Sequence, residues 1–465
     1  MRKFLKTKII CTLGPSTFEK KSIKELVSEE VDVLRFNFSH GNHTQFKKIL
    51  NDIREVNENI SLMADLKGTE IRTFVKKDSG IPLKEGEKIN LVFDNKDVNQ
   101  NNFSLHYSNI KDISKKGMEL LIDDGKVNFK ILDVKKDHLV LKTISDGILF
   151  DKKSTHFIDA DVPFPLLTEQ DKKDIKFALD NDFDFIAASM IKSEREIYAI
   201  RGLLDESINL VSKIEHPEAV KNIEKIIDAS DQILVARGDL GVKMPITKVP
   251  IIQKNIVKKA RERGKPVIIA TQLLESMVEN PRPTRAEVND IASAIFSYVD
   301  ALMLTGETAA GKYPIEAVRV LKEVIKNTEN SIDYSEYLNK ARVDKGNISE
   351  SISSAAVDAA YSLPAKAILC FTASGSTALR VAKFRPKVPV FAFTHNKIVA
   401  RQLNSVFGII PFTIGFFQNI DKMFEEAEEI LKENSFIKNN DRVIITAGTP
   451  IGKTGTTNII KIVEI

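Results

Sequence analysis

Charged side chains at the ends of two successive apolar segments could together bind a metal ion and an anion. In NLVSKIEHP (209–217), Lys213 and Glu215 are two residues apart, so in a strand they point to the same side. Asp239 ends the next apolar segment, QILVARGDLG (232–241), and neighbouring strands lie only about 4.8 Å apart. One divalent cation, Mg²⁺ or Mn²⁺, could take oxygen ligands from Glu215 and Asp239. Lys213 would add positive charge for a transferring anion.

The same residues allow a structural reading, because ion-pair networks also collect at strand ends. Lys213 with Glu215, and Arg237 with Asp239, could be two pairs that close the top of a sheet. Arg237-Gly238-Asp239 is also an adhesion tripeptide, which would have to lie exposed on a loop tip. The flanking ILVA and LGV predict burial instead, so we favour an active site in which Arg237 braces the structure and Gly238 lets backbone approach a substrate.

RFNFSHG places three polar residues on one side of an expected strand. Alternation puts Arg35, Asn37 and Ser39 together, with the two phenylalanines on the opposite side. Consecutive inward polar residues are costly in a core, so they indicate a ligand or an ion, or a polar plug bonded to neighbouring loops. His40 and His43 have a spacing that suggests zinc, but no cysteine lies nearby and Gly41 breaks a helix, so we do not expect a zinc site.

Further polar residues close other apolar segments at the same rim. Asp65 ends SLMADLKG, and Arg72 follows the DLKGTEI turn. Thr271 ends PVIIATQ, where a threonine alone is more often a cap for the next helix. Together these residues predict one polar edge rather than scattered surface positions.

The elements that must position these residues form a regular series. Short β-branched segments, each closing on polar or small residues, alternate with helical periodicity. They are residues 8–15, 32–41, 61–68, 183–190, 209–217, 232–241, 266–272 and 301–308. Eight such units predict a parallel (β/α)₈ TIM barrel, in which active sites lie at the carboxyl ends of the strands.

Two regions differ from the barrel in their pattern of predicted strands and helices, and this difference predicts separate domains. A strand-rich and turn-rich stretch interrupts the series after the third strand and reads as a small inserted all-β barrel, which would stand over the barrel mouth as a lid. The last part alternates strand and helix in AKAILCFTASGSTALRVAKF, PVFAFT, DRVIITAGTP and NIIKIVEI, and these four strand segments predict an open α/β sheet. The expected domains are the barrel at 1–69 and 161–330, the insert at 70–160, and the carboxyl-terminal domain at 331–465.

Two loops of the last domain could hold an anion. TASGSTA (372–378) lies between a strand and a helix, where it is either an anion loop or a simple helix cap. AGTPIGKTG nearly fits a nucleotide-binding P-loop, with Ala447 in place of the first glycine. A P-loop needs a helix at its lysine, yet the chain continues as a strand, so we reject that interpretation.

Composition narrows the protein class. With 43% hydrophobic and 28% charged residues, the 465-residue chain is globular, and its net charge of +4 without long runs of one sign predicts no nucleic-acid partner. Cys11 and Cys370 lie in apolar segments far apart, which indicates buried thiols in a reducing compartment. We find neither a signal peptide nor an apolar segment of membrane-spanning length, so a cytoplasmic location is expected.

The blocks TKIICTLGP, RFNFSHG, ADLKGTEIR, KIEHPEAV, VARGDLGV, ATQLLESM, NPRPTRAEVNDIA and LMLTGETAAGKYP resemble, in this order, the pyruvate kinase family. The similarity extends over essentially the whole chain. It implies transfer of the phosphoryl group of phosphoenolpyruvate to Mg-ADP, giving ATP and pyruvate in the final step of glycolysis. It also implies a homotetramer regulated by a sugar phosphate.

The resemblance assigns roles residue by residue. Glu215 and Asp239 match the divalent-metal ligands, and Lys213 matches the lysine that stabilises the transferring group. The positions that match arginines around substrate phosphates and the threonine near the protonation step are Arg35, Arg72 and Thr271. Gly238 lies with Asp239 in the matching substrate-binding block.

Three further sites follow from the same resemblance. The positions that match the K⁺ site are Asn37, Ser39, Asp65 and the carbonyl of Leu66. Asn37 and His40 match nucleotide-binding positions, and the positions that resemble an effector pocket are Thr372, Ser374, Gly375, Ser376 and Thr377.

Departures from the family pattern leave two points open. Glu70 resembles the potassium-dependent branch, whereas Leu66 occurs in enzymes that do without K⁺. The insert carries KKSTHF where a lysine-glycine-valine-asparagine segment is usual, which leaves the lid contacts to nucleotide undefined. A metal-assisted enolate lyase or aldolase on the same barrel would share Glu215 and Asp239 but would need neither the K⁺ site nor a nucleotide lid.

Overall fold

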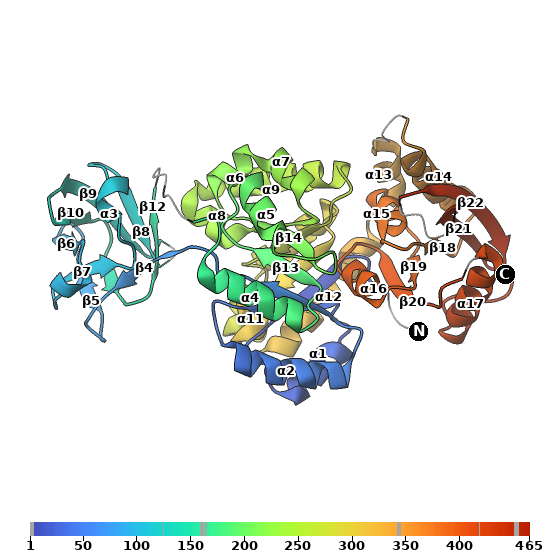
Figure 1. Ribbon diagram of the computed structural model, residues 1–465, viewed down its shortest axis with the longest axis horizontal. Coiled ribbons are helices and arrows are strands. Elements are labelled where there is room, and N and C mark those ends of the chain that lie inside the picture. Colours follow the sequence, from blue (N-terminus) through green and yellow to red (C-terminus); the bar gives the residue numbers. More distant parts are fainter. Residues whose placement is uncertain are drawn as a thin grey trace.

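The computed structural model describes residues 4–123, 125–158, 162, 165–341, 346–417, 419–450 and 455–465. Within them the chain forms three bodies in a row (Figure 1), with a small β domain at one end, a barrel in the middle and an α/β domain at the other end. The fold class predicted from the sequence, a TIM barrel with an inserted β domain and a carboxyl-terminal α/β domain, is confirmed. The expected boundary between 160 and 161 lies outside the described residues.

The middle body is a closed parallel barrel of the eight expected strands, in the order β1-β17-β16-β15-β14-β13-β3-β2. The strands are β1 (Lys8–Leu13), β2 (Val33–Asn37), β3 (Ser61–Asp65), β13 (Phe185–Ala188), β14 (Asn209–Ile214), β15 (Gln232–Ala236), β16 (Val267–Ala270) and β17 (Ala301–Leu304). All eight are apolar and buried over almost their whole length, as a parallel sheet covered on both faces requires.

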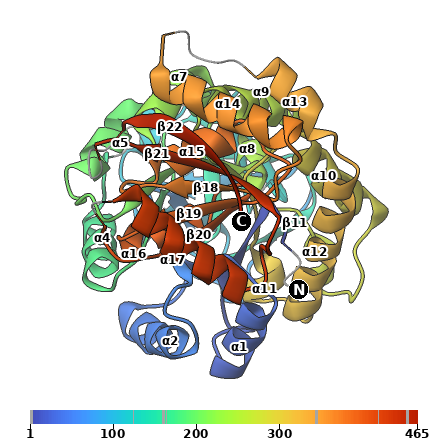
Figure 2. The same cartoon turned by 90° about the vertical axis from the view of Figure 1, so that its right-hand side faces the viewer.

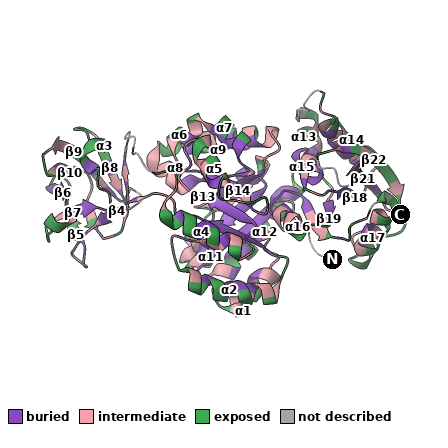
Figure 3. Cartoon of the chain, viewed as in Figure 1, coloured by how far each residue is buried: buried purple, intermediate pink, exposed green. Residues whose placement is uncertain are grey.

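Helices surround the barrel (Figure 2) and bury their apolar sides against it. They are α1 (Lys20–Ser28), α2 (His43–Val56), α4 (Glu169–Asp180), α5 (Glu194–Arg201), α6 (Pro217–Lys221), α7 (Ile223–Ala229), α9 (Val249–Glu262), α10 (Arg285–Phe296) and α12 (Pro314–Asn330). The burial pattern in Figure 3 shows buried strands at the centre and exposed outer helix faces. This shell keeps the strand ends fixed.

The insert is a second closed barrel, of seven strands in the order β10-β6-β7-β4-β12-β8-β9. Its strands are β4 (Ile71–Phe74), β6 (Lys88–Val92), β7 (Asn102–Leu105), β8 (Glu119–Ile122), β9 (Val127–Val134), β10 (His138–Thr143) and β12 (Ser154–Phe157), with a separate pair of β5 (Ile81–Leu83) and β11 (Gly147–Leu149). It has its own apolar core, built around Phe103 and Phe129. The all-β prediction for this segment is confirmed.

The last domain contains a five-stranded sheet in the order β20-β19-β18-β21-β22. Its strands are β18 (Ala367–Phe371), β19 (Val390–Thr394), β20 (Ile409–Thr413), β21 (Arg442–Gly448) and β22 (Thr457–Glu464), and its main helices are α14 (Ile348–Ser362), α15 (Ser376–Lys383), α16 (Lys397–Leu403) and α17 (Ile420–Glu433). Strand β22 runs antiparallel to β21. The sequence predicted four of these strands and missed β20.

Two buried ion pairs attach this domain to the amino ends of the barrel strands. Arg385 donates from both terminal nitrogens to Asp300, just before β17, at 2.9 and 2.7 Å. Arg401 donates from Nε to Asp184, just before β13, at 2.6 Å. The carboxyl-terminal domain therefore docks on the end of the barrel opposite to the one where active sites form.

We expect Arg385→Ala to lower the free energy of unfolding by about 3–5 kcal/mol, because it leaves the carboxylate of Asp300 buried without its charged partner. Denaturant unfolding would measure the change. Arg442→Ala is the matched control, since Arg442 pairs with Glu464 at 3.2 Å on the surface and should cost less than about 1 kcal/mol. Equal effects of the two substitutions would contradict the role given to Arg385.

Candidate active site

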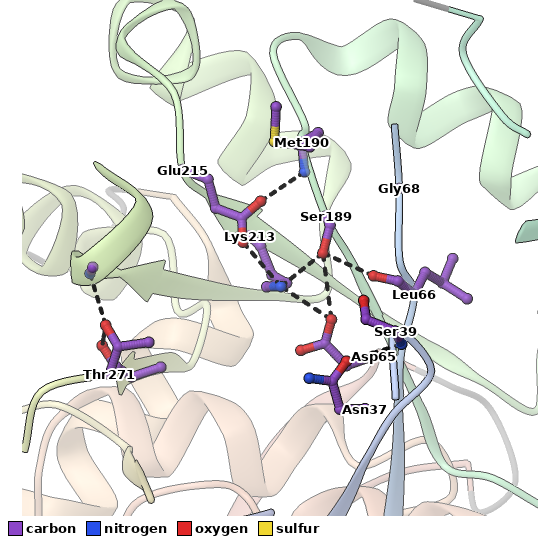
Figure 4. A network of polar contacts seen from close by, with 12 residues as sticks. Asn37, Ser39, Asp65, Leu66, Gly68, Ser189, Met190, Lys213, Glu215 and Thr271 are labelled. Carbon is purple, nitrogen blue, oxygen red and sulfur yellow. Dashed lines mark hydrogen bonds and ion pairs between the residues drawn. The ribbon is translucent and has the colours of Figure 1, made fainter. Parts of the chain in front are cut away.

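The barrel interior changes from apolar to polar toward the carboxyl ends of its strands. Val33, Met63 and Val211 face one another in the inner core. Two residues further along the same strands stand Arg35, Asp65 and Lys213, which alternation also turns inward. The polar edge predicted from the sequence is therefore the top layer of the barrel (Figure 4).

Lys213 is the centre of this layer. Its Nζ lies 3.0 Å from Asp65 Oδ1, 2.9 Å from Glu215 Oε1 and 2.7 Å from Ser189 Oγ. Burial disfavours the charged ammonium, but the carboxylates of Asp65 and Glu215 outweigh it and raise the pKa of Lys213. The lysine is a permanent positive charge held in an almost closed setting.

Arg35 supports the same carboxylate from the other side. Its Nε donates to Asp65 Oδ2 at 2.7 Å, and Nη1 donates to Thr12 Oγ1 at 2.8 Å. Burial alone would raise the pKa of Asp65, but Arg35 and Lys213 lower it, so the carboxylate stays ionised. One buried anion thus holds two cations in fixed positions.

Oxygen atoms suited to a monovalent cation collect beside Asp65. Asn37 Oδ1 accepts a hydrogen bond from the backbone N–H of Ser39 at 3.0 Å, directly after β2. Figure 4 shows Asn37, Ser39, Asp65 and Leu66 close together. This set of amide, hydroxyl, carboxylate and carbonyl oxygens fits a hard cation such as K⁺.

Ser189 is a site residue that the sequence reasoning missed. It follows β13 and donates from Oγ to the carbonyl of Leu66 at 2.8 Å, while it accepts from Lys213. Its hydroxyl therefore links the lysine to the oxygen set of the monovalent site. A single serine after FIAA carries no distinguishing sequence signal.

The two acids proposed for a divalent cation differ in how they are held. Glu215, buried directly after β14, accepts from the backbone N–H of Met190 at 2.8 Å through Oε2. Asp239 lies in the first turn of α8 (Arg237–Lys243), close enough for its charge to act on Lys213. Among the described residues, no group of three or more acidic, histidine or cysteine side chains is placed so that it could hold a metal ion. Two carboxylates suit Mg²⁺, which takes its other ligands from water and substrate phosphates.

The Arg-Gly-Asp tripeptide is not an exposed loop. Arg237 is 8% exposed, donates to the carbonyls of Thr271 and Gln272 at 2.7 and 2.8 Å, and pairs with Asp290. The adhesion interpretation required an exposed tip and is therefore wrong. Arg237 braces the end of β16, as the sequence indicated.

Thr271 is held in an uncommon backbone conformation at φ +68°, although it is β-branched. Its Oγ1 accepts from the backbone N–H of Gly238 at 2.8 Å. A Cβ at Gly238 would lie 3.4 Å from this oxygen, so a side chain there would be in van der Waals contact with the hydroxyl. Strained backbone of this kind persists where the surroundings impose it, and it often marks functional sites.

Arg72 and His40 stand at the edge of this layer. Arg72 lies on β4 of the insert and pairs with Glu70 at 2.8 Å rather than with the buried acids of the barrel. His40 follows β2; partial desolvation and the charges of Arg72 and Arg35 lower its pKa. Arg72 of the insert is therefore near enough to His40 of the barrel for its charge to act on the imidazole.

The proposed effector residues gather at the carboxyl end of β18. Thr372, Ser374, Ser376 and Thr377 line one cavity, together with residues 447 and 448 of β21. Gly375 caps α15 in the left-handed conformation at φ +81°. The part of the AGTPIGKTG loop at 451–454 lies outside the described residues, but β22 begins at Thr457 as a strand.

The histidine of the KKSTHF segment predicts a loss of stability in acid. Burial, then the charges of Lys243 and His216, lower the pKa of His156 to about 3. In the unfolded chain this imidazole takes up a proton near pH 6.5, whereas in the folded chain it stays neutral until the pH is near 3. The free energy of unfolding therefore falls as the pH drops from 6.5 toward 3. We expect the wild type to lose about 2 kcal/mol at pH 5 through this group.

His156→Gln should remove that part of the pH dependence. Denaturant unfolding at pH 8 and pH 5 would measure it, with a substitution of exposed His106, His106→Gln, in the same domain as the matched control. A wild-type profile in His156→Gln would count against a neutral, buried His156.

The geometry of the barrel mouth by itself defines the class of protein. A (β/α)₈ barrel with a lysine, an arginine and two candidate metal carboxylates at the carboxyl ends of its strands is an arrangement for binding and stabilising a transferring anion.

The comparisons give the particular family. Residues 4–318 match the model "Pyruvate kinase, barrel domain", and residues 350–463 match "Pyruvate kinase, alpha/beta domain". The chain is 39% identical to a pyruvate kinase of Sporosarcina psychrophila, over 98% of this chain and 80% of that protein, and 37% identical to one of Clostridium perfringens, over 99% and 100%. A crystal structure of a pyruvate kinase from Cryptosporidium parvum superposes with a TM-score of 0.93 at 33% identity, covering 99% of this chain and 96% of that one. The chain belongs to the pyruvate kinase family, and it is a phosphotransferase.

Proposed function

We propose that this protein transfers the phosphoryl group of phosphoenolpyruvate to ADP, forming ATP and pyruvate, as an ATP:pyruvate 2-O-phosphotransferase. The observation that carries the proposal is the placement of Lys213 between Asp65, Glu215 and Ser189 at the barrel mouth. A β-phosphate oxygen of ADP attacks phosphorus, and the bond from phosphorus to the enol oxygen breaks. The enolate left behind takes a proton at C3.

Electrostatic stabilisation is the main task in this reaction, because the transition state is loose and carries charge on the phosphoryl oxygens. Lys213 and Arg35 present fixed positive charge to those oxygens, and Arg72 adds charge from the rim. Thr271, beside Gly238, lies on the other side of the layer and would bind the three-carbon substrate near the protonated carbon. Asn37 and His40 would contact the nucleotide.

Two cations belong to the proposal. Glu215 and Asp239 would hold Mg²⁺ or Mn²⁺, which supplies positive charge and orients phosphate oxygens when bound. Asn37, Ser39, Asp65 and the Leu66 carbonyl would hold K⁺. The oxygen-only donor sets of both groups support these assignments.

The proposal also covers regulation of the enzyme and its assembly from subunits. The cavity that includes Ser374 and Ser376 would take a sugar phosphate, and the insert would act as a lid. Exposed Ile246 and Ile251 near the start of α9 support burial between subunits, as a homotetramer would provide. Two free, buried cysteines support a cytoplasmic location. No described helix has the length and hydropathy needed to cross a membrane.

The direct test is pyruvate formation from phosphoenolpyruvate with Mg²⁺, with and without ADP. The proposal expects formation that depends on ADP. Pyruvate without ADP would favour a phosphatase or a lyase on the same barrel. No turnover by folded protein, even with sugar phosphates added, would refute the proposal.

We expect K⁺ to raise the rate about tenfold or more over tetramethylammonium at equal ionic strength, because the site adds a positive charge beside the transferring group. Ser39→Ala should shift the K⁺ midpoint upward without abolishing activity at high K⁺. Equal rates with and without K⁺ in the wild type would show that Leu66, not Glu70, indicates the branch to which this chain belongs.

A further inference from the structure

Lys243 stands beside the proposed metal carboxylates but belongs to none of the roles given above. It ends α8, four residues after Asp239. Residues four apart on a helix lie on the same face, with their Cβ atoms about 5–6 Å apart. The helix that carries one proposed metal ligand therefore also carries a lysine on the same face.

The side chain of Lys243 also contacts the residue that holds the second carboxylate. Its Nζ lies 3.3 Å from Met190 Sδ, and the backbone N–H of the same methionine donates to Glu215 Oε2 at 2.8 Å. Met190 has a left-handed backbone at φ +60°, and both contacts are made by this one residue. The ammonium is thus held next to the residue that positions Glu215.

Lys243 keeps its charge uncompensated at short range. Within the part of the chain that the structure describes, its ammonium donates to the weak acceptor Met190 Sδ and forms no ion pair. Burial is the largest effect and leaves the pKa of Lys243 below its usual range, although the charges of Glu215, Asp239 and Glu70 raise it, so the three carboxylates act on the ammonium without contacting it. A fixed cation in such a place opposes a second cation at the same carboxylates.

We propose that Lys243 is a positioning residue that weakens divalent-cation binding to the substrate-free protein, so that the cation binds firmly only together with a phosphate-bearing substrate. The inference rests on the proposed assignment of Glu215 and Asp239 to the divalent cation. Phosphate oxygens bring the negative charge that offsets Lys243 and also supply ligands to the cation. Binding of cation and substrate is then coupled, and by linkage each strengthens the other.

The experiment is a titration of substrate-free protein with Mn²⁺, in which electron paramagnetic resonance measures the free ion. We expect Lys243→Met to lower the Mn²⁺ dissociation constant about tenfold. Lys243→Arg keeps the charge and should stay within about twofold of the wild type. Exposed Lys248→Met, five residues further on, is the matched surface control and should also leave the constant unchanged.

A second series with phosphoenolpyruvate present tests the coupling. The gain in Mn²⁺ affinity caused by the substrate should be smaller in Lys243→Met than in the wild type. If Lys243→Met does not fold, Lys243→Gln provides the same loss of charge with a polar side chain.

The outcomes separate the inference from the proposed function. An unchanged or larger dissociation constant in folded Lys243→Met, with Glu215→Gln weakening Mn²⁺ binding, would overturn the role of Lys243 alone. Wild-type Mn²⁺ binding in Glu215→Gln would overturn the metal site and this inference together.

Discussion

Replacing Lys213 by methionine is expected to lower kcat for pyruvate formation about 10³-fold or more. The ammonium is the positive charge nearest the point where Asp65, Glu215 and Ser189 converge, and removal of one preorganised electrostatic group typically costs about 10²–10³ in rate. The KM for phosphoenolpyruvate should change much less, because the charge matters most where negative charge develops in the transition state. Steady-state kinetics at saturating ADP and Mg²⁺ measure both constants.

The control for this variant must separate catalysis from folding, because Lys213→Met also removes the charged partner of buried Glu215 and one of the two cations on Asp65. Lys8→Met is matched: Lys8 is a buried barrel lysine that pairs with Asp32 at 3.3 Å, at the opposite end of β1. It should lose stability but keep kcat within about threefold. Comparable loss of kcat in both variants would remove Lys213 from the chemistry.

Glu215→Gln is expected to lower activity about 10²–10³-fold at low Mg²⁺ and to move the Mg²⁺ midpoint to higher concentration. Glutamine keeps the length of the side chain and an oxygen for the N–H of Met190, so the local backbone should survive. What is lost is a carboxylate ligand and its charge. Activity measured as a function of Mg²⁺, together with a thermal melt, tests this expectation.

The matched control is Glu307→Gln at the same end of the barrel. Glu307 is fully buried and accepts from the backbone N–H groups of Leu274 and Thr305 at 3.0 and 2.7 Å. Its substitution should leave the Mg²⁺ midpoint in place. A shift of the midpoint in Glu307→Gln but not in Glu215→Gln would contradict the assignment of the metal ligand.

The barrel could be predicted from the sequence because each of its strands shows the same two features. A short segment buried on both faces ends in polar or small residues, and this pattern occurs eight times with helical segments between. Strand alternation alone predicted that Arg35 points inward and that Lys213 and Glu215 share one side, and the structure places Arg35 and Lys213 on Asp65. The local sequence pattern was sufficient to predict the barrel because the barrel repeats one strand–helix unit.

Strand β20 was missed for a physical reason. Its sequence, IIPFT, contains Pro411, and a proline usually excludes a segment from a sheet because it cannot donate to the ladder. Here β20 is the edge strand of the five-stranded sheet, where one side of the strand needs no donor. Edge position is a property of the assembled sheet and cannot be read from five residues.

Contacts between distant segments were also beyond the sequence. Ser189 and Met190 reach Lys213 and Glu215 only because β13 and β14 pair in register. A serine or a methionine in the sequence does not by itself indicate such a role. Lys243 reads as a surface lysine until α8 brings it beside the carboxylates. The strand order of the insert, with β6 and β7 parallel among antiparallel neighbours, likewise depends on long-range pairing.

In the proposed reaction, one barrel mouth centred on Lys213 moves a phosphoryl group from phosphoenolpyruvate to ADP. Phosphorus NMR of wild-type protein with both substrates, Mg²⁺ and K⁺ would follow the phosphoryl group itself. We expect the phosphoenolpyruvate signal to decay while the γ-phosphate signal of ATP grows in equal amount. Inorganic phosphate in place of ATP, or no change in either signal with folded protein, would contradict it.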